Sequence, residues 1–284
     1  MTIAIIPVPI SKWRFNQQWP DIIMPLSEDL NFLQYAIVQA SMFGVEAIYV
    51  IAHIATNPLI KKGIGEYIMD PVYSDSTSVE KTLLRQRYIP IHFMPVNAAI
   101  KSFRESVFFY SLHGVINVDK IYRSISRFVV PNNYIIIPPY SVFDYASIRK
   151  NRRLLKKDNK LLWSYNGETI KDGIPLPFII TYKEALQFEK EAYENIIDIM
   201  ENIRLSKSPD AQILFEEYMR SSISFERLAD DNALPLEVEF FYNVDSWESY
   251  RKLMANKIFR SPPDYLFKYR EFYPFGEDKL DVKN

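Results

Sequence analysis

The sequence predicts an α/β fold, a three-layer α/β/α sandwich around a mostly parallel central sheet. Over residues 1–150, short apolar runs alternate with stretches whose apolar residues recur at helical spacing. The apolar runs are nearly continuous, as in strands that are covered on both faces. Strands that alternate with helices in this way form parallel sheets with right-handed crossovers, so we expect helices on both faces of the sheet.

The expected strands and helices of this part follow one another closely. The run TIAIIPV at 2–8 predicts a buried first strand. A helix at 27–44 is expected to begin at the N-cap Ser27 and to end at Gly44. The remaining expectations are strands at 45–53, at 89–96 and at the start of 134–145, and helices at 78–88 and 99–126.

The pattern changes after residue 150. Turn signals at Asn166-Gly167 and Asp172-Gly173 predict a small β excursion, which C-terminal helices follow. These helices are expected at 182–205, 208–221 and 224–231, before a strand, a loop and a helix within 236–256. We expect a single domain over 1–284, with an insertion-like subregion at 161–235 and a surface-wrapping tail at 257–284.

The composition excludes several classes of protein. The chain has 284 residues, a formal net charge of −1 and no cysteine, which excludes disulfides and cysteine-based zinc sites. The weak net charge provides no field for nucleic acid. The basic run at 149–160 is expected to be a solvated surface, with a phosphate-rich partner as the alternative. Without an apolar span or a signal peptide, we expect a soluble cytoplasmic protein that does not contact membranes.

The glycine-rich phosphate loops of nucleotide-binding proteins are missing. The GxG formed by Gly63 and Gly65 has no third glycine and follows no evident strand, and we interpret it as a turn. The loop after the first strand, PVPISKWRF, contains no glycine but carries Lys12 and Arg14. These two cations could clamp the phosphates of a nucleotide, and a solvated basic loop is the alternative.

Other candidate residues follow the carboxyl ends of the expected strands, where open parallel sheets bind their ligands. The side chains that could converge there are Lys12, Arg14, Lys101, Arg104, Tyr140 and Asp144. The three histidines are scattered along the chain, and His92 lies inside an apolar run, where a core histidine is expected. No Ser-His-Asp arrangement is therefore predicted.

Two carboxylates are candidates for holding Mg²⁺. Asp245 follows the apolar run VEFFY, and an Asp at the end of a strand projects into the ligand crevice. The alternative is that Asp245 or Ser246 caps the following helix. Asp144 is the natural second ligand, with a turn residue as the alternative.

Several stretches resemble the nucleotide-diphospho-sugar transferase superfamily. The stretches are AIIPV, WPDIIMPL, FLQYAIVQASMFGVEAIYVIAH and FYNVDSWESYRKLMA, and they occur in the family's order over roughly 1–150 and 236–256. A marine bacterial or phage branch with a proline-tyrosine loop is also similar. The resemblance implies the fold of sugar nucleotidyltransferases, with a nucleotide lining at Pro7, Val8 and Pro9 and a metal at Asp245.

The sequence departs from the family pattern in its phosphate loop. Proline cannot donate a backbone N–H, so phosphate recognition by the backbone is weakened at PVPISKWRF. The family's Pro-Lys pair falls at Pro20-Asp21, and its first metal-binding Asp falls near Tyr140, with Asp144 a little later. Only Asp245 matches the family's chemistry in both residue type and context.

Three functions follow from these observations. The first is a Mg²⁺-dependent nucleotidyltransferase that joins a sugar phosphate to a nucleoside triphosphate, and a glycosyltransferase of the GT-A type, which uses a nucleotide sugar, is an alternative. The third function is an inactive binding or assembly module. A homo-oligomer is compatible with the sequence. The enzyme predicts Asp245 and Asp144 in one crevice near Arg14, whereas the module predicts that Asp245 only caps its helix and that Trp13 or Tyr140 fills the cleft.

Overall fold

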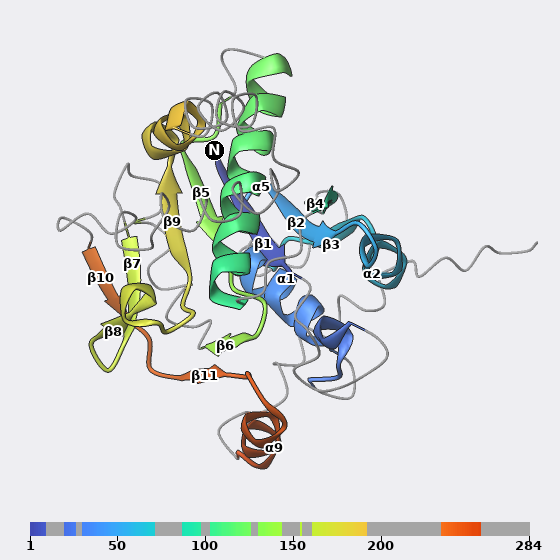
Figure 1. Ribbon diagram of the computed structural model, residues 1–284, viewed down its shortest axis with the longest axis vertical. Coiled ribbons are helices and arrows are strands. Elements are labelled where there is room, and N and C mark those ends of the chain that lie inside the picture. The colour runs from blue at the N-terminus through green and yellow to red at the C-terminus, as the bar shows by residue number, and fades with distance from the viewer. Residues whose placement is uncertain are drawn as a thin grey trace, which may run out of the picture.

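The computed structural model describes residues 1–9, 20–26, 30–71, 87–97, 103–125, 130–143, 154, 161–191 and 234–256. Within this part, nine strands form one sheet whose main path runs β10-β7-β9-β5-β1-β2-β4-β3, with β8 paired to β7. The strands of this sheet are β1 Thr2–Val8, β2 Ala47–His53, β3 Tyr67–Met69, β4 Tyr88–Val96, β5 Asn133–Ile136, β7 Leu161–Tyr165, β8 Glu168–Thr169, β9 Phe178–Thr181 and β10 Leu234–Glu237. Helices cover both faces of the sheet around β1 (Figure 1), which confirms the α/β/α prediction.

The centre of the sheet is parallel, as the apolar runs predicted. β1 lies between β2 and β5 and pairs in parallel with both of them, and β2 pairs in parallel with β4. The side chains of β1 are buried from Ile3 to Val8. They alternate between two cores, as the two-residue period of a strand requires.

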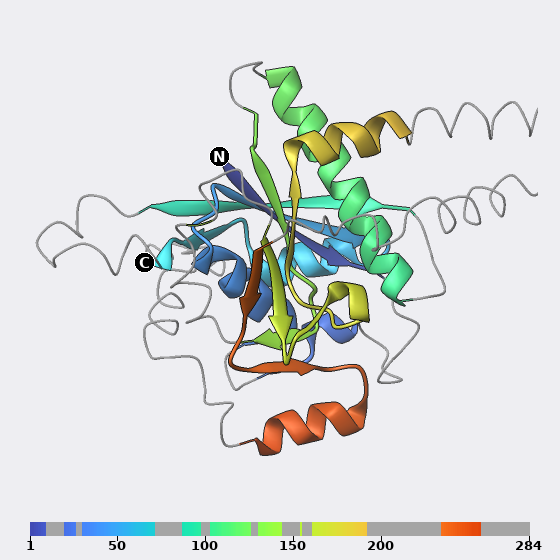
Figure 2. The ribbon, with the colours of Figure 1, turned by 90° about the vertical axis from the view of Figure 1, so that its left-hand side faces the viewer.

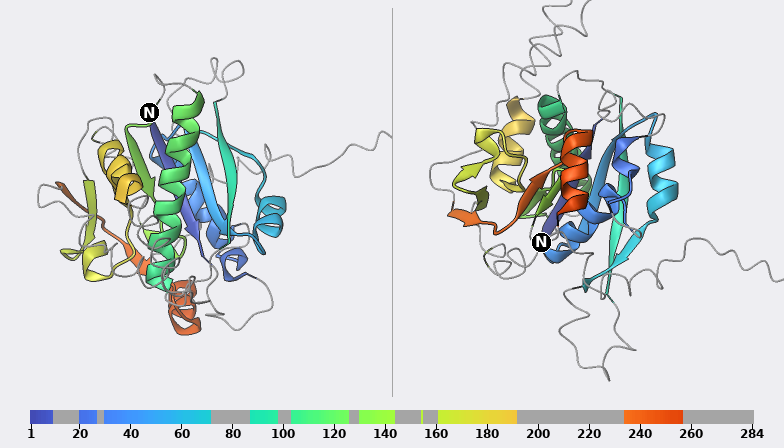
Figure 3. Two further views of the ribbon diagram at one scale, coloured as in Figure 1. Left: turned by 45° about the horizontal axis from the view of Figure 1, so that its top comes forward. Right: turned by 90° about the horizontal axis from the view of Figure 1, so that it is seen from below.

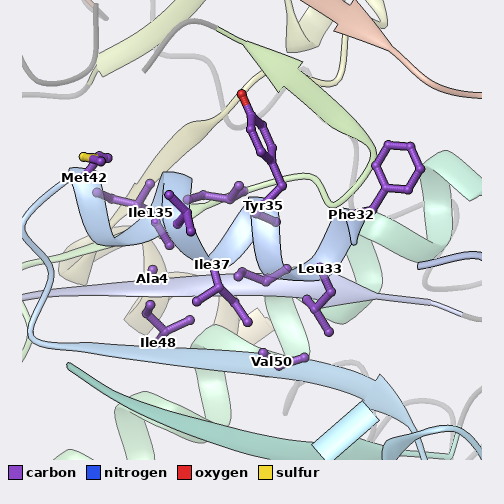
Figure 4. Packing of buried hydrophobic residues seen from close by; sticks show 14 of the residues in the cluster. Ala4, Phe32, Leu33, Tyr35, Ile37, Met42, Ile48, Val50 and Ile135 are labelled. Atoms are coloured by element: carbon purple, nitrogen blue, oxygen red, sulfur yellow. The ribbon is translucent and has the colours of Figure 1, made fainter. Parts of the chain in front are cut away.

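One core lies between the sheet and α1 (Phe32–Met42), and the other lies between the sheet and α5 (Phe103–Ile125). Figure 4 shows the first core, where Leu33 and Ile37 of α1 point toward Ala4, Ile48 and Val50 of the sheet. The second core includes Ile3, Ile5, Tyr49, Tyr134 and Ile136 from the opposite face of the same strands, together with Val115 and Val118 of α5.

Helix α1 begins later than expected. Its N-cap is Asn31, whose side chain accepts from Gln34 N, while the Gln34 side chain accepts from Asn31 N in a capping box. The expected N-cap, Ser27, lies outside the described residues. The expected end is close, because the helix stops at Met42 and Gly44 follows with a φ of +70°, a conformation that favours glycine.

The expected turn at the GxG is a helix end. A helix that the sequence did not predict, α2 (Asn57–Ile64), contains Gly63 and is capped by Gly65, whose φ is 89°. The short edge strand β3, also not predicted, follows it and pairs antiparallel with β4. Local pattern missed both elements because α2 has only eight residues and β3 only three.

The expected β excursion belongs to the central sheet. The hairpin at Asn166-Gly167 joins β7 to β8 as predicted. However, β9 pairs antiparallel with β5, and β10 pairs in parallel with β7, so these strands widen the main sheet. A helix follows β9 over 182–191. The helices expected at 208–221 and 224–231 and the tail at 257–284 lie outside the described residues, as does nearly all of the helix expected at 78–88.

A second, two-stranded sheet lies near one end of the molecule. β6 (Ser141–Phe143), a strand where a loop was expected, pairs antiparallel with β11 (Phe241–Asn243), and α9 (Trp247–Ala255) follows β11. Figure 2 shows β11 and α9 together at the bottom of the molecule. Among the described helices, none is both long and apolar enough to cross a bilayer.

Candidate functional site

The site was predicted at the carboxyl ends of the central strands, and the structure describes where these strands end. β1 ends at Val8, β2 at His53 and β4 at Val96, and β5 leads through a short turn into β6. Arg104 lies in the first turn of α5. The other charged candidates at these ends, Lys12, Arg14, Lys101 and Asp144, lie outside the described residues, so their roles stay predictions.

The end of β1 is part of the core. Pro7 pairs with Ile51 and Val8 pairs with Ala52, and Pro7, Val8 and Pro9 are all buried. Buried apolar side chains cannot clamp a phosphate, so these residues would line a nucleotide through their backbone and their shape.

Tyr140 is a packing residue in the described structure. Its side chain is 3% exposed, and its ring lies 5.8 Å from the ring of Phe32 at the start of α1. Its backbone carbonyl accepts from Val244 N at 3.1 Å, which ties the turn after β5 to the segment after β11. A contact between Tyr140 and a nucleotide stays a prediction.

Asp245 is exposed and does not cap α9. The N-cap is Ser246, whose side chain accepts from Ser249 N, and Ser249 Oγ accepts in turn from Ser246 N. The backbone N–H of Asp245 also donates to Ser249 Oγ, at 3.0 Å. The alternative prediction of a cap at Asp245 or Ser246 is therefore confirmed for Ser246 and wrong for Asp245. Within the part of the chain that the structure describes, its carboxylate makes no hydrogen bond or ion pair.

An open hollow of about 410 Å³ lies beside this carboxylate. It is lined by Phe241, Tyr242, Asn243, Asp245, Ser246, Glu248, Ser249 and Lys252. Asn243 Oδ1 is buried without a hydrogen bond. Glu248 is already paired with Lys252 at 2.6 Å. The hydrogen bond from Lys252, followed by its positive charge, lowers the pKa of Glu248. Asp245 is therefore the exposed carboxylate of this hollow that pairs with no described residue.

A magnesium ion at Asp245 would need oxygens of a substrate to complete its coordination. Within the described residues, no three His, Asp or Glu side chains gather closely enough to enclose a metal ion. Mg²⁺ prefers oxygen ligands, and it is commonly bound by one or two carboxylates together with substrate phosphates. One exposed carboxylate beside an open hollow is compatible with that mode of binding and not with a closed set of protein ligands.

Helix α9 holds the hollow against the carboxyl end of the central sheet. Tyr250 Oη donates to Pro25 O at 2.6 Å, and the rings of Tyr250 and Phe32 lie 6.2 Å apart. Leu253 is fully buried in the core that contains α1. The right-hand view of Figure 3, from below, shows α9 in front of the central strands.

Solved structures with this architecture include sugar nucleotidyltransferases. A UDP-glucose pyrophosphorylase from Acinetobacter baumannii is 11% identical, with a TM-score of 0.51, over 96% of this chain and 98% of its own. A UTP-bound form from the same organism has the same identity and TM-score over 100% of both chains. A Bacillus anthracis protein assigned as a glucose-1-phosphate thymidylyltransferase, in complex with sucrose, is 9% identical, with a TM-score of 0.50, over 94% and 99%.

The chain has a nucleotide-diphospho-sugar transferase fold. The resemblance seen in the sequence is thereby confirmed at the level of the fold, at low identity. No protein-family profile matches the chain, and no curated protein matches it by sequence.

The histidines are dispersed over this nucleotide-diphospho-sugar transferase fold. The expectation of a core histidine is wrong for His92, which is exposed on β4, and its ring lies 4.8 Å from the ring of Tyr49. His53 ends β2, and its Nδ1 accepts from Ala55 N at 3.1 Å. Partial desolvation of their rings lowers the pKa of His53, His92 and His113.

Sequence reasoning missed two residues that shape the site of this fold. Asn243 lines the hollow and lies in the stretch FYNVDSWESYRKLMA, in which Asp245 was the predicted ligand. Gln39 is 1% exposed and hydrogen bonds to β6. A glutamine among the apolar residues of a helix was a signal that could have identified it, because buried polar side chains are normally hydrogen bonded.

Proposed function

We propose that the protein is a nucleotidyltransferase that joins a sugar phosphate to a nucleoside triphosphate, with a divalent metal held at Asp245. The observation that carries the proposal is the exposed Asp245 carboxylate, held by β11 and α9 at the carboxyl end of the sheet. The proposal is supported by a fold shared over nearly the whole chain with two UDP-glucose pyrophosphorylase structures, one of them UTP-bound.

The residues of the chain would contribute binding and positioning to this reaction. An oxygen of the sugar phosphate attacks the α-phosphorus of the triphosphate, and the bond to the leaving pyrophosphate breaks. Asp245, with Asp144 as a second carboxylate, would hold a Mg²⁺ ion, which supplies charge neutralisation at the phosphates when bound. Lys12 and Arg14 would bind the phosphates with side-chain donors, in place of the backbone donors that Pro7 and Pro9 lack.

A second candidate function is a non-catalytic binding module of the same fold. Tyr140 favours it, because its ring is buried against Phe32 near the place where the family has its first metal-binding aspartate. This is the arrangement expected if an aromatic side chain fills part of the cleft.

Pyrophosphate release by the purified protein tests the proposal. The protein would be incubated with each nucleoside triphosphate, a panel of sugar 1-phosphates and Mg²⁺. We expect release with one pairing, and we expect Asp245→Asn to lower kcat/KM by about 100-fold, because transition-state charge would lose a positioned cation. The control is Glu66→Gln, an exposed carboxylate at the start of β3 that is paired with Lys61 at 3.1 Å, and it should retain full activity.

Two results would contradict the proposal. Equal activity of Asp245→Asn and the wild type would remove the metal site from Asp245. An absence of pyrophosphate with every pairing, at protein concentrations comparable to the substrate, would favour the binding module.

A further inference from the structure

The two-stranded sheet of β6 and β11 needs more than its own pairing. Its register joins Ser141 to Asn243 and Phe143 to Phe241, and an isolated pair of strands is marginally stable in water. In a strand, the peptide groups of successive residues point to opposite edges. The groups of Ser141 and Phe143 therefore share one edge of β6. Both residues are at most 2% exposed, so that edge must find partners inside the protein.

The side chain of Gln39 supplies these partners from α1. With one orientation of its carboxamide, Nε2 donates to Phe143 O at 3.4 Å. With the amide turned over, Nε2 donates to Ser141 O at 3.3 Å and Oε1 accepts from Phe143 N at 3.2 Å. The second orientation satisfies both polar atoms, and a hydrogen-bond network selects it for that reason. The carboxamide then bonds to β6 as the peptide group of a neighbouring strand would.

Other contacts attach β6 at the same place. Tyr35 Oη donates to Phe143 O at 3.5 Å, and Figure 4 shows Tyr35 pointing away from Ala4, Ile48 and Val50, on the side of α1 remote from the central sheet. Ser141 Oγ donates to Pro175 O, in the segment before β9. These bonds fix β6 in place, and β11 is fixed through β6.

We propose that Gln39 is a positioning residue, whose carboxamide takes the place of a third strand beside β6 and thereby sets the position of β11 and of the Asp245 loop. Asp245 follows the last residue of β11 by two positions, and Asp144 directly follows Phe143. Both predicted metal ligands thus extend from strands that α1 anchors. The link to metal binding rests on the proposed function, whereas the pairing of Gln39 with β6 stands on the hydrogen bonds.

Amide hydrogen exchange tests the pairing without any activity. In the wild type, the Phe143 N–H should be protected, and exchange at the rate of an unstructured peptide would overturn the proposal. Gln39→Leu, or Gln39→Met if the first variant does not fold, should speed exchange at Phe143 about tenfold or more while β1 and β2 keep their protection. The matched control is Ser41→Ala, because Ser41 is equally buried on α1 but, among the described residues, its hydroxyl bonds within α1 to Val38 O, at 2.7 Å.

The metal dependence of turnover tests the positioning. Gln39→Leu should raise the Mg²⁺ concentration for half-maximal rate about tenfold and keep most of kcat at saturating Mg²⁺. A loss of stability alone would lower kcat without changing the Mg²⁺ requirement. Faster exchange at Phe143 with an unchanged Mg²⁺ requirement would overturn the positioning role, and so would faster exchange throughout the core. If the wild type turns over no nucleotide, the proposed function fails, and the exchange at Phe143 alone decides the role of Gln39.

Discussion

At the scale of single residues, Asp119 of α5 is a buried carboxylate that needs partners for its charge. Its carboxylate is 1% exposed, accepts from Tyr134 Oη at 2.8 Å and lies 2.6 Å from Arg123 Nε. Arg123 also pairs with Glu189 of the helix over 182–191. The Nζ atom of Lys120 lies 3.8 Å from the Glu189 carboxylate. Burial, followed by the bond to Asp119, raises the pKa of Tyr134, so it remains a neutral donor. A buried negative charge of this kind persists only because a cation and a donor face it.

Removing the cation should therefore cost much more than a surface ion pair would. We expect Arg123→Ala to lower the free energy of unfolding by about 3 kcal/mol, because Asp119 is left buried without its counter-charge. Urea denaturation monitored by circular dichroism measures this loss. The double variant Asp119→Asn with Arg123→Met should recover part of the stability, since it removes both charges. A loss below about 0.5 kcal/mol for Arg123→Ala would show that the network is no stronger than a surface pair.

At the scale of elements, α5 packs unusually close to the sheet at one position. A Cβ atom added at Gly114 would lie 2.7 Å from Ile51 Cγ1 and 3.0 Å from Ile5 Cγ2. Both isoleucines are fully buried in the centre of the sheet and have little room to move. The sequence places a glycine, which weakens helices, in the middle of a helix of 23 residues, and the close approach is the physical reason.

Gly114→Ala should accordingly destabilise the protein although alanine favours helices. We expect a loss of about 1–3 kcal/mol from overpacking, which exceeds the gain in helix propensity of about 1 kcal/mol. The matched control is Gly63→Ala in α2, where a Cβ would meet nothing within 4 Å, and this variant should be neutral or stabilising. Thermal unfolding of both variants measures the difference. An equal response of the two variants would show that α5 can move away from the sheet at little cost.

At the scale of the whole molecule, the end of the described chain returns to its beginning. β10 extends the sheet beside β7, β11 pairs with β6, and α9 contacts the segment before α1. The bond from Tyr250 Oη to Pro25 O joins residues 225 positions apart at 2.6 Å. The predicted ligands of the site, from β1 to Asp245, therefore come from both ends of the sequence.

Loss of this tie should loosen α9 before the rest of the molecule. We expect Tyr250→Phe to cost about 1 kcal/mol, the usual value of one hydrogen bond, with faster amide exchange in α9 and unchanged exchange in β1. Hydrogen exchange with mass spectrometry resolves the two segments. Uniform acceleration in α9 and β1 would mean that α9 opens only with the whole fold.

Most of the central fold followed from local sequence pattern. The limits of β1, β2, β4 and α5 fall within a few residues of the expected ones, because their apolar runs and helical spacing are long enough to be specific. The start of α1 was misplaced because Ser27 and Asn31 are both good N-caps, and only the bonds between Asn31 and Gln34 show which one is used. At the site, Asp245 is exposed, and its role as a metal ligand stays a prediction.

The sequence by itself determined the alternation of strands and helices, the buried parallel centre and the α/β class, since each depends on side chains that are neighbours along the chain. Tertiary structure alone decided that β7, β9 and β10 join the main sheet and that Gln39 bonds to β6. These outcomes depend on backbone edges and polar groups of separate segments, and local periodicity does not show which edge will be free to pair.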